Sequence, residues 1–219
     1  MDGDIENLTI AEYRKLEKIF PEFGRFATRL TAKSYDDFTN TLYQDIDEII
    51  SQIQENAEYR QKDSEDRLTI DIRDQLNRLG YNASHESKHR GHADIIVENK
   101  RKDFIWIGEA KIHRSYDYLW EGFLQLTTRY STGDCDQKEG GIFIYIKVKK
   151  AKSVIERWQK FLSEKNLTNY LLEPCKMREL SFFSTHEHGV SGMNFKVRHM
   201  PVLLYFKPED DSGRNKKKA

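Results

Sequence analysis

Two carboxylates and one lysine stand inside the most apolar, strand-like part of this chain. Asp94 directly precedes Ile-Ile-Val, a polar turn follows at residues 99–103, and the next apolar run, residues 104–112, contains Glu109 and Lys111. Burying an unpaired charge in such a segment costs on the order of several kcal/mol. We therefore expect these three side chains to pair with one another or to bind a cation, and the fold must allow it.

Composition restricts the class of protein without revealing its partner. The 219 residues contain 36 basic and 36 acidic side chains, so attraction to a phosphate backbone would have to come from local clusters. The only cysteines are Cys135 and Cys175, which predicts free thiols rather than a disulfide framework. No run approaches the roughly 18 apolar residues of a membrane span, and the acidic N-terminus does not resemble a signal peptide. We expect a soluble, cytoplasmic protein with no membrane association.

Hydrophobic periodicity predicts a helical region at residues 1–62, an α/β domain at residues 63–208 and a disordered tail at residues 209–219. In the first region an apolar stripe predicts a long helix over residues 34–60, facing either the rest of the chain or a partner. The elements expected after it are a helix at 64–80, strands at 81–87, 93–98 and 104–112, a helix at 115–130, a strand at 141–148, a helix at 151–165, and strands at 176–186 and 194–206. Residues 87–92 are polar and are expected to form a loop.

The spacing of the charged residues predicts a site for a hard cation. Side chains alternate across a strand, so Glu109 and Lys111 point to the same face. The turn brings Asp94 back toward Glu109 if the two strands pair in a suitable register, and the carbonyl of Ala110 lies near the same edge. Carboxylate and carbonyl oxygens suit Mg²⁺ or Mn²⁺. A lysine beside them can orient a water or stabilise charge on a phosphate.

The pattern Asp94…Glu109-Ala110-Lys111, set in the order helix, three strands, helix, strand, resembles the PD-(D/E)XK nuclease superfamily over about residues 64–148. The resemblance implies a restriction-endonuclease-like αβββαβ core with a mixed central sheet flanked by helices, extended by the N-terminal helices and by a C-terminal helix and strands. It also implies that Asp94 and Glu109 bind the metal and that Lys111 serves the attacking water. The family often carries a proline just before the aspartate. This chain has no proline there, and His92 and Ala93 occupy that neighbourhood.

The same resemblance implies two further site residues. Many members carry a glutamate on the first core helix, where Glu65 is the best match and Asp66 the alternative. Some exonuclease-like branches carry Gln-x-x-x-Tyr on the helix after the lysine. Here Gln125 and Tyr130 are separated by one residue more than that pattern allows, so Gln125 is a candidate, and Arg129 is an alternative phosphate contact. Glu65 as a solvated first-turn residue and Gln125 as a surface amide remain open.

Basic residues cluster around the candidate site in the sequence. The candidates for contact with a nucleic-acid backbone are Lys88, Arg90, Lys100, Arg101 and Lys102, together with Arg129. Such runs are also typical of solvated surfaces. The histidines are not accompanied by cysteine pairs, which argues against zinc. His186 and His188, at an expected strand end, are expected to be exposed.

These observations predict a divalent-metal-dependent nuclease that hydrolyses nucleic acid, with DNA favoured and Mg²⁺ or Mn²⁺ as the cofactor. Small nucleases of this kind with added helices resemble effectors of bacterial anti-phage defence. The alternative is a non-catalytic subunit of the same fold that binds a protein or nucleic acid. The N-terminal helices are the expected surface for a homo-oligomer or partner subunit. A buried but inert salt-bridge network is the competing interpretation of the three charged residues.

Overall fold

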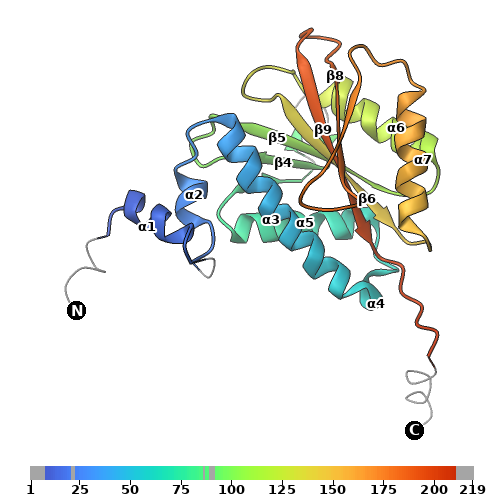
Figure 1. The fold of residues 1–219 in the computed structure, drawn as a ribbon, viewed down its shortest axis with the longest axis horizontal. Coiled ribbons are helices and arrows are strands. Elements are labelled where there is room, and N and C mark those ends of the chain that lie inside the picture. The colour runs from blue at the N-terminus through green and yellow to red at the C-terminus, as the bar shows by residue number, and fades with distance from the viewer. Residues whose placement is uncertain (1–7, 21–22, 86, 89–91, 211–219) are drawn as a thin grey trace.

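A seven-stranded mixed sheet forms the centre of the protein in the computed structural model, which describes residues 8–20, 23–85, 87–88 and 92–210 (Figure 1). Across the sheet the strands follow the order β1 (Asn82–Ser84), β4 (Ile95–Glu98), β5 (Ile105–Ile112), β6 (Glu139–Ile146), β9 (Asn194–Leu203), β8 (Phe182–Glu187) and β7 (Leu171–Pro174). The three central strands β5, β6 and β9 run parallel, and the remaining pairs are antiparallel. The parallel β5–β6 connection passes through a helix, as parallel pairs require.

Helices cover both faces of this sheet (Figure 1). One face carries α3 (Tyr35–Glu55) and α5 (Glu65–Arg78), and the other carries α6 (Tyr116–Leu124), the π-helix η3 (Gln125–Tyr130) and α7 (Ala151–Ser163). The short helices are α1 (Ile10–Glu17), α2 (Phe26–Leu30) and α4 (Ala57–Arg60). Among the described residues, no helix combines the length and apolar character needed to cross a membrane.

Strict alternation along the strands fills both layers of the core. On β6, Phe143 and Tyr145 pack toward α3 and α5, whereas Ile142 and Ile144 pack toward α6 and α7. Both faces are therefore apolar, which explains the near-continuous hydrophobic strands. A charged side chain on β5 must lie under a helix rather than in solvent.

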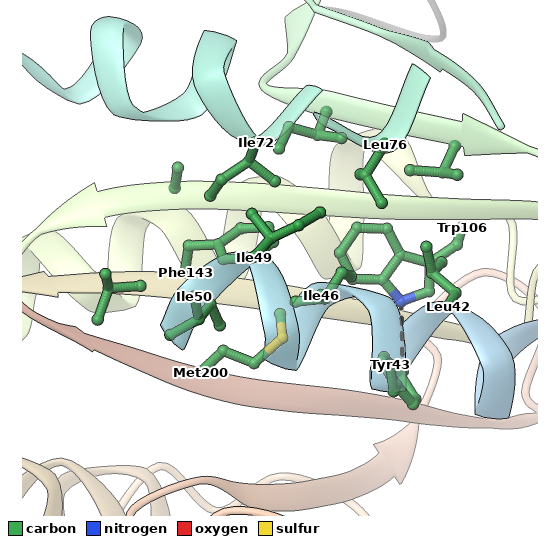
Figure 2. Packing of buried hydrophobic residues seen from close by; sticks show 14 of the residues in the cluster. Leu42, Tyr43, Ile46, Ile49, Ile50, Ile72, Leu76, Trp106, Phe143 and Met200 are labelled. Carbon is green, nitrogen blue, oxygen red and sulfur yellow. Dashed lines mark hydrogen bonds between the residues drawn. The ribbon is translucent and has the colours of Figure 1, made fainter. Parts of the chain in front are cut away.

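The long helix α3 belongs to this core and not to a separate N-terminal region. Leu42, Ile46 and Ile50 are fully buried, and they share one cluster with α5 and the sheet (Figure 2). Trp106 Nε1 donates a hydrogen bond to the hydroxyl of Tyr43 at 3.2 Å. The predicted boundary near residue 62 thus divides one packed unit. The apolar stripe is covered by the chain itself and is not available to a partner.

Several local predictions were wrong. The expected loop at 87–92 contains a small antiparallel pair, β2 (Ser87–Lys88) with β3 (His92–Ala93), and β7 was not predicted at all. Strands this short carry too few residues for a period of two to be recognisable. The helix expected over 115–130 is α-helical only to Leu124 and continues as η3. The tail predicted to be disordered lies outside the described residues beyond Asp210.

Candidate functional site

The β4–β5 hairpin sets Asp94 opposite Glu109. Ile95 pairs with Gly108, and the next position outward in the same antiparallel register joins Asp94 to Glu109. Asp94 itself interrupts the strand between β3 and β4, which frees its carboxylate to turn back onto β5. Its Oδ2 accepts a hydrogen bond from the Ala110 N–H at 2.8 Å. The register that the sequence analysis required is therefore present.

Glu109 and Lys111 share the face of β5 that α6 covers, as alternation predicts. The Lys111 ammonium forms an ion pair and hydrogen bond with Glu109 Oε1. It also lies 3.9 Å from Asp94 Oδ2 and 3.8 Å from Glu65 Oε1. Glu109 is 1% exposed and Lys111 7%. Asp94, Glu109, Lys111 and Glu65 therefore converge on one point, where Glu109 and Lys111 are buried and Asp94 and Glu65 are partly exposed.

Glu65 reaches this point from the first turn of α5. Ser64 caps the helix by accepting the Arg67 N–H, which places Glu65 at the first helical position. Its carboxylate accepts the Ile112 N–H at 2.6 Å and the hydroxyl of Tyr118 at 3.1 Å. Glu65 is therefore a site residue, and it is not merely solvated. Asp66 makes none of these contacts, although its charge acts on Asp94.

Tyr118 is a site residue that the sequence analysis missed. Its hydroxyl holds Glu65, and its ring lies 5.6 Å from the Lys111 ammonium and 5.4 Å from the Arg114 guanidinium. The only sequence signal is its position in the first turn of the helix that follows the Glu-Ala-Lys strand. Periodicity does not distinguish such a residue from an ordinary aromatic on an amphipathic helix.

The electrostatics of the site indicate an excess of negative charge. Burial, reinforced by the charge of Asp94, raises the pKa of Glu109 to about 8 despite the adjacent ammonium. Burial likewise raises the pKa of Asp94, with Lys111 partly offsetting it. Burial opposes the charge on Lys111, but Glu109 and the other carboxylates outweigh it and raise the pKa of the amine. Three carboxylates and one ammonium leave two negative charges when all are ionised, so the site favours an added cation.

The donor set fits a hard divalent ion, although it is not a ready-made metal cluster. Within the described ranges, no three His, Cys, Asp or Glu side chains are grouped so as to hold a metal ion. The Glu65 oxygens already receive hydrogen bonds, and the Lys111 ammonium lies among the acids. However, Glu109 Oε2 is buried and has no hydrogen-bond partner. The Ala110 carbonyl lies on the same strand edge as its N–H, and thus on the Asp94 side. Asp94, Glu109 and the Ala110 carbonyl are the groups available to a cation.

The π-helix resolves the spacing mismatch between Gln125 and Tyr130. Because π-helical hydrogen bonds join residues five apart, Tyr130 lies about one turn beyond Gln125, as a residue four apart does in an α-helix. Burial raises the pKa of Tyr130, and the charges of Glu109 and Asp94 raise it further, so the phenol lies near both acids. The Gln125 Oε1 atom is buried without a hydrogen-bond partner.

The predicted basic cluster does not gather at the site. Lys100, Arg101 and Lys102 occupy the β4–β5 turn, at the opposite end of β4 from Asp94, roughly 16 Å away at the usual strand rise. Arg129 is exposed on η3, and its charge acts on the neighbouring Tyr130 phenol, which keeps it as a candidate contact. Arg90 lies outside the described residues, and of Lys88 only the backbone is described.

His186 and His188, expected to be exposed, are 4% and 0% exposed. Ser131 Oγ lies 2.9 Å from His188 Nε2, and Phe123 packs against the His186 ring. The error arises because η3 and the loop after it cover this end of β8.

Comparison of the chain with protein-family models, with curated proteins and with solved structures gave no match. The site must therefore be interpreted from its own geometry.

Proposed function

We propose that this protein is a divalent-metal-dependent nuclease that hydrolyses phosphodiester bonds, with DNA as the favoured substrate. The observation that carries the proposal is the convergence of Asp94, Glu109 and Lys111, with the Lys111 ammonium within 4 Å of both acids. Apart from the small β2–β3 pair and the π-helix η3, the chain order is α5, β1, β4, β5, α6 and β6. This order agrees with the one that the resemblance to the PD-(D/E)XK superfamily implies, which supports the same proposal.

Each residue has a role that follows from its contacts. Asp94, Glu109 and the Ala110 carbonyl would hold Mg²⁺ or Mn²⁺, which when bound supplies Lewis acidity and an activated water. Lys111 would orient the attacking water and stabilise negative charge at the phosphate. Glu65 and Tyr118 lie on the other side of Lys111, with Glu65 Oε1 3.8 Å and the centre of the Tyr118 ring 5.6 Å from the ammonium, and the Tyr118 hydroxyl donates to Glu65. Gln125, Tyr130 and Arg129 line the adjoining helix as candidate substrate contacts.

Incubation with closed circular DNA, linear DNA and RNA tests the proposal. We expect cleavage of DNA in Mg²⁺ or Mn²⁺ and its complete loss on addition of a chelator, because the two acids bind the cation that drives hydrolysis. Loss of the closed circle would identify internal cutting, and shortening of linear DNA alone would identify action from ends. Absence of cleavage with every ion and substrate would favour the alternative of a non-catalytic subunit.

Gly122 on α6 offers a second test, because its missing side chain makes room for the site. A Cβ atom at this position would lie 2.8 Å from Lys111 Cγ and 3.0 Å from Cε. Gly122→Ala should favour the helix by roughly 1 kcal/mol. It should nevertheless slow cleavage by about tenfold to a hundredfold, because a shift of about 1 Å in a reacting group is enough for such losses.

The measurements for this variant are the cleavage rate and the unfolding temperature. Gly189→Ala is the matched control, since a Cβ there meets nothing within 4 Å. Equal cleavage rates in wild type and Gly122→Ala would show that the site does not need the space left by the missing side chain of Gly122.

A further inference from the structure

The Lys111 ammonium occupies the position that a cation would take between the acids. It contacts Glu109, lies 3.9 Å from Asp94 and 3.8 Å from Glu65, and is 7% exposed as a residue. Two positive ions cannot occupy one buried point without strong repulsion, because the interior screens charge poorly. A divalent ion bound by Asp94 and Glu109 is therefore incompatible with the ammonium in its present position.

The three carboxylates are held in different ways. Glu65 is fixed by the Ile112 N–H and the Tyr118 hydroxyl, neither of which depends on Lys111. Glu109 relies on Lys111 alone, because its second oxygen is buried without a partner. Removal of the ammonium would thus leave Glu109 with two unpaired oxygens but would leave Glu65 anchored. The hydrogen bonds of Glu65 therefore keep it in place, whereas Glu109 has oxygens free to bind a cation.

We propose that Lys111 is a displaceable counter-ion: its ammonium offsets one of the two negative charges of the Asp94–Glu109 pair until a divalent ion enters, and then moves to Glu65. The inference rests on the metal site of the proposed function. The lysine stem is flexible, and Glu65 Oε1 already lies 3.8 Å from the ammonium. The Tyr118 ring, 5.6 Å from the ammonium, adds a cation–π contact on that side. Glu65 is accordingly a positioning residue for Lys111 and not a metal ligand.

Displacement makes the ammonium and the divalent ion competitors. Calorimetric titration with Mn²⁺, without nucleic acid, should show that Lys111→Met binds the ion about tenfold or more tightly than wild type, within the range usual for coupled sites. Lys111→Gln is the second variant if the methionine variant fails to fold. Lys160→Met is the matched control: it removes the same charge from α7, where the Lys160 side chain is 78% exposed and pairs with Glu164. We expect the Mn²⁺ affinity of this variant to stay within about threefold of wild type, because an exposed charge is screened by solvent and salt.

A double-mutant cycle tests the role of Glu65. Glu65→Gln should weaken Mn²⁺ binding severalfold, because the ammonium loses the carboxylate to which it moves. In the Lys111→Met background the same substitution should have no effect. If Glu65 were a metal ligand, the loss would persist in the double variant, and that result would overturn its assignment as the receiving group.

The outcomes separate this inference from the function beneath it. One outcome would overturn the proposal that Lys111 is a displaceable counter-ion but leave the proposed nuclease function standing. It is Mn²⁺-dependent DNA cleavage by the wild type together with equal or weaker Mn²⁺ affinity in Lys111→Met. Failure of wild type and all variants to bind Mn²⁺ would overturn both. Tighter binding in Lys111→Met and loss of the Glu65 effect in the double variant would establish the inference.

Discussion

Asp94→Asn is expected to slow DNA cleavage by on the order of 10³-fold, because it removes one of the two charges that hold the cation. The asparagine amide keeps the size of the side chain, and its oxygen can still accept the Ala110 N–H that Asp94 now accepts at 2.8 Å. Glu109→Gln should have a similar effect for the same reason. The measurement is the initial rate of loss of closed circular plasmid at saturating Mg²⁺ and again at saturating Mn²⁺.

Both substitutions should leave the fold intact, which circular dichroism and thermal unfolding can check. Neutralising either acid reduces repulsion within a cluster in which negative charges outnumber positive ones, so no large loss of stability is expected. Asp103→Asn is the matched control, since Asp103 is exposed in the turn at the far end of the same hairpin. Cleavage by Asp94→Asn within about threefold of wild type would remove the basis for assigning it to the metal.

The cleavage and binding measurements should move in opposite directions for Lys111. Its removal vacates the cation position, so Mn²⁺ binds more tightly. The same removal takes away the group proposed to orient water, so cleavage should fall. A residue that only stabilised the fold would weaken both properties together. The divergence therefore distinguishes a working lysine from an inert salt-bridge network.

Much of this site could be predicted from local sequence, because it depends on local geometry. The alternation of β5 places Glu109 and Lys111 on one face whatever surrounds them. A short hairpin turn then allows few registers, and one of them joins Asp94 to Glu109. Local sequence alone does not place Glu65 at the site, since its hydrogen-bond partner Ile112 lies 47 residues away along the chain. The resemblance to a known family indicated a glutamate on this helix, and the helix pattern selected Glu65 over Asp66, because Glu65 extends the apolar face of the helix by one turn.

Features that depend on three-dimensional packing were not predictable in the same way. Tyr118 and Gly122 matter because α6 crosses directly above Lys111, and nothing in the helix sequence indicates that crossing. A π-helical turn, which brings Tyr130 toward the acids, has no reliable periodic signal. The misplaced basic cluster had a simpler cause. Residues 100–102 are close to Asp94 in sequence, but a whole strand separates them in space.

Buried histidines on the far side of α6 give the second large expected effect, a loss of stability in mild acid. His199 is fully buried against Phe182, with ring centroids 4.2 Å apart. Trp158 Nε1 donates to its Nδ1 at 3.1 Å, so the single ring proton lies on Nε2, facing Ser184 Oγ at 2.8 Å. A second proton would have to sit on Nδ1 against the indole N–H. Protonation of the buried His199 ring is therefore strongly disfavoured, and the ring stays neutral.

The pKa shifts give the direction and the range of this effect. Burial lowers the pKa of His199 to about 3 and that of His186 to about 4, from the ordinary histidine value of 6.5, with smaller contributions from neighbouring histidines. Because both folded values lie below the unfolded value, the unfolded chain binds more protons, and stability falls as the pH falls below about 6.5. At pH 5 each histidine should have lowered the free energy of unfolding by about 2 kcal/mol, and the two together by about 4 kcal/mol.

The whole protein should lose less stability in acid than the two histidines alone would cause, because protonation of Glu109 acts in the opposite direction. Its pKa is about 8, above the unfolded value, so its protonation in the folded state adds stability as the pH falls through the same range. The decisive quantity is therefore the difference between wild type and a His186→Gln/His199→Gln double variant. We expect urea unfolding at pH 7 and pH 5 to show an acid loss about 4 kcal/mol larger in wild type than in the variant.

His92→Gln, at an exposed position on β3, provides the control for a general effect of removing a histidine. Identical pH dependence in wild type and the double variant would show that these rings can be protonated inside the fold. The Trp158 N–H would then have to give up its acceptor, and the tautomer deduced from that hydrogen bond would be wrong. The result bears on the site as well, because Phe123 packs against both rings from α6, the helix that covers Glu109 and Lys111. Protonation of the histidines would therefore disturb the packing of α6, the helix that lies against Lys111.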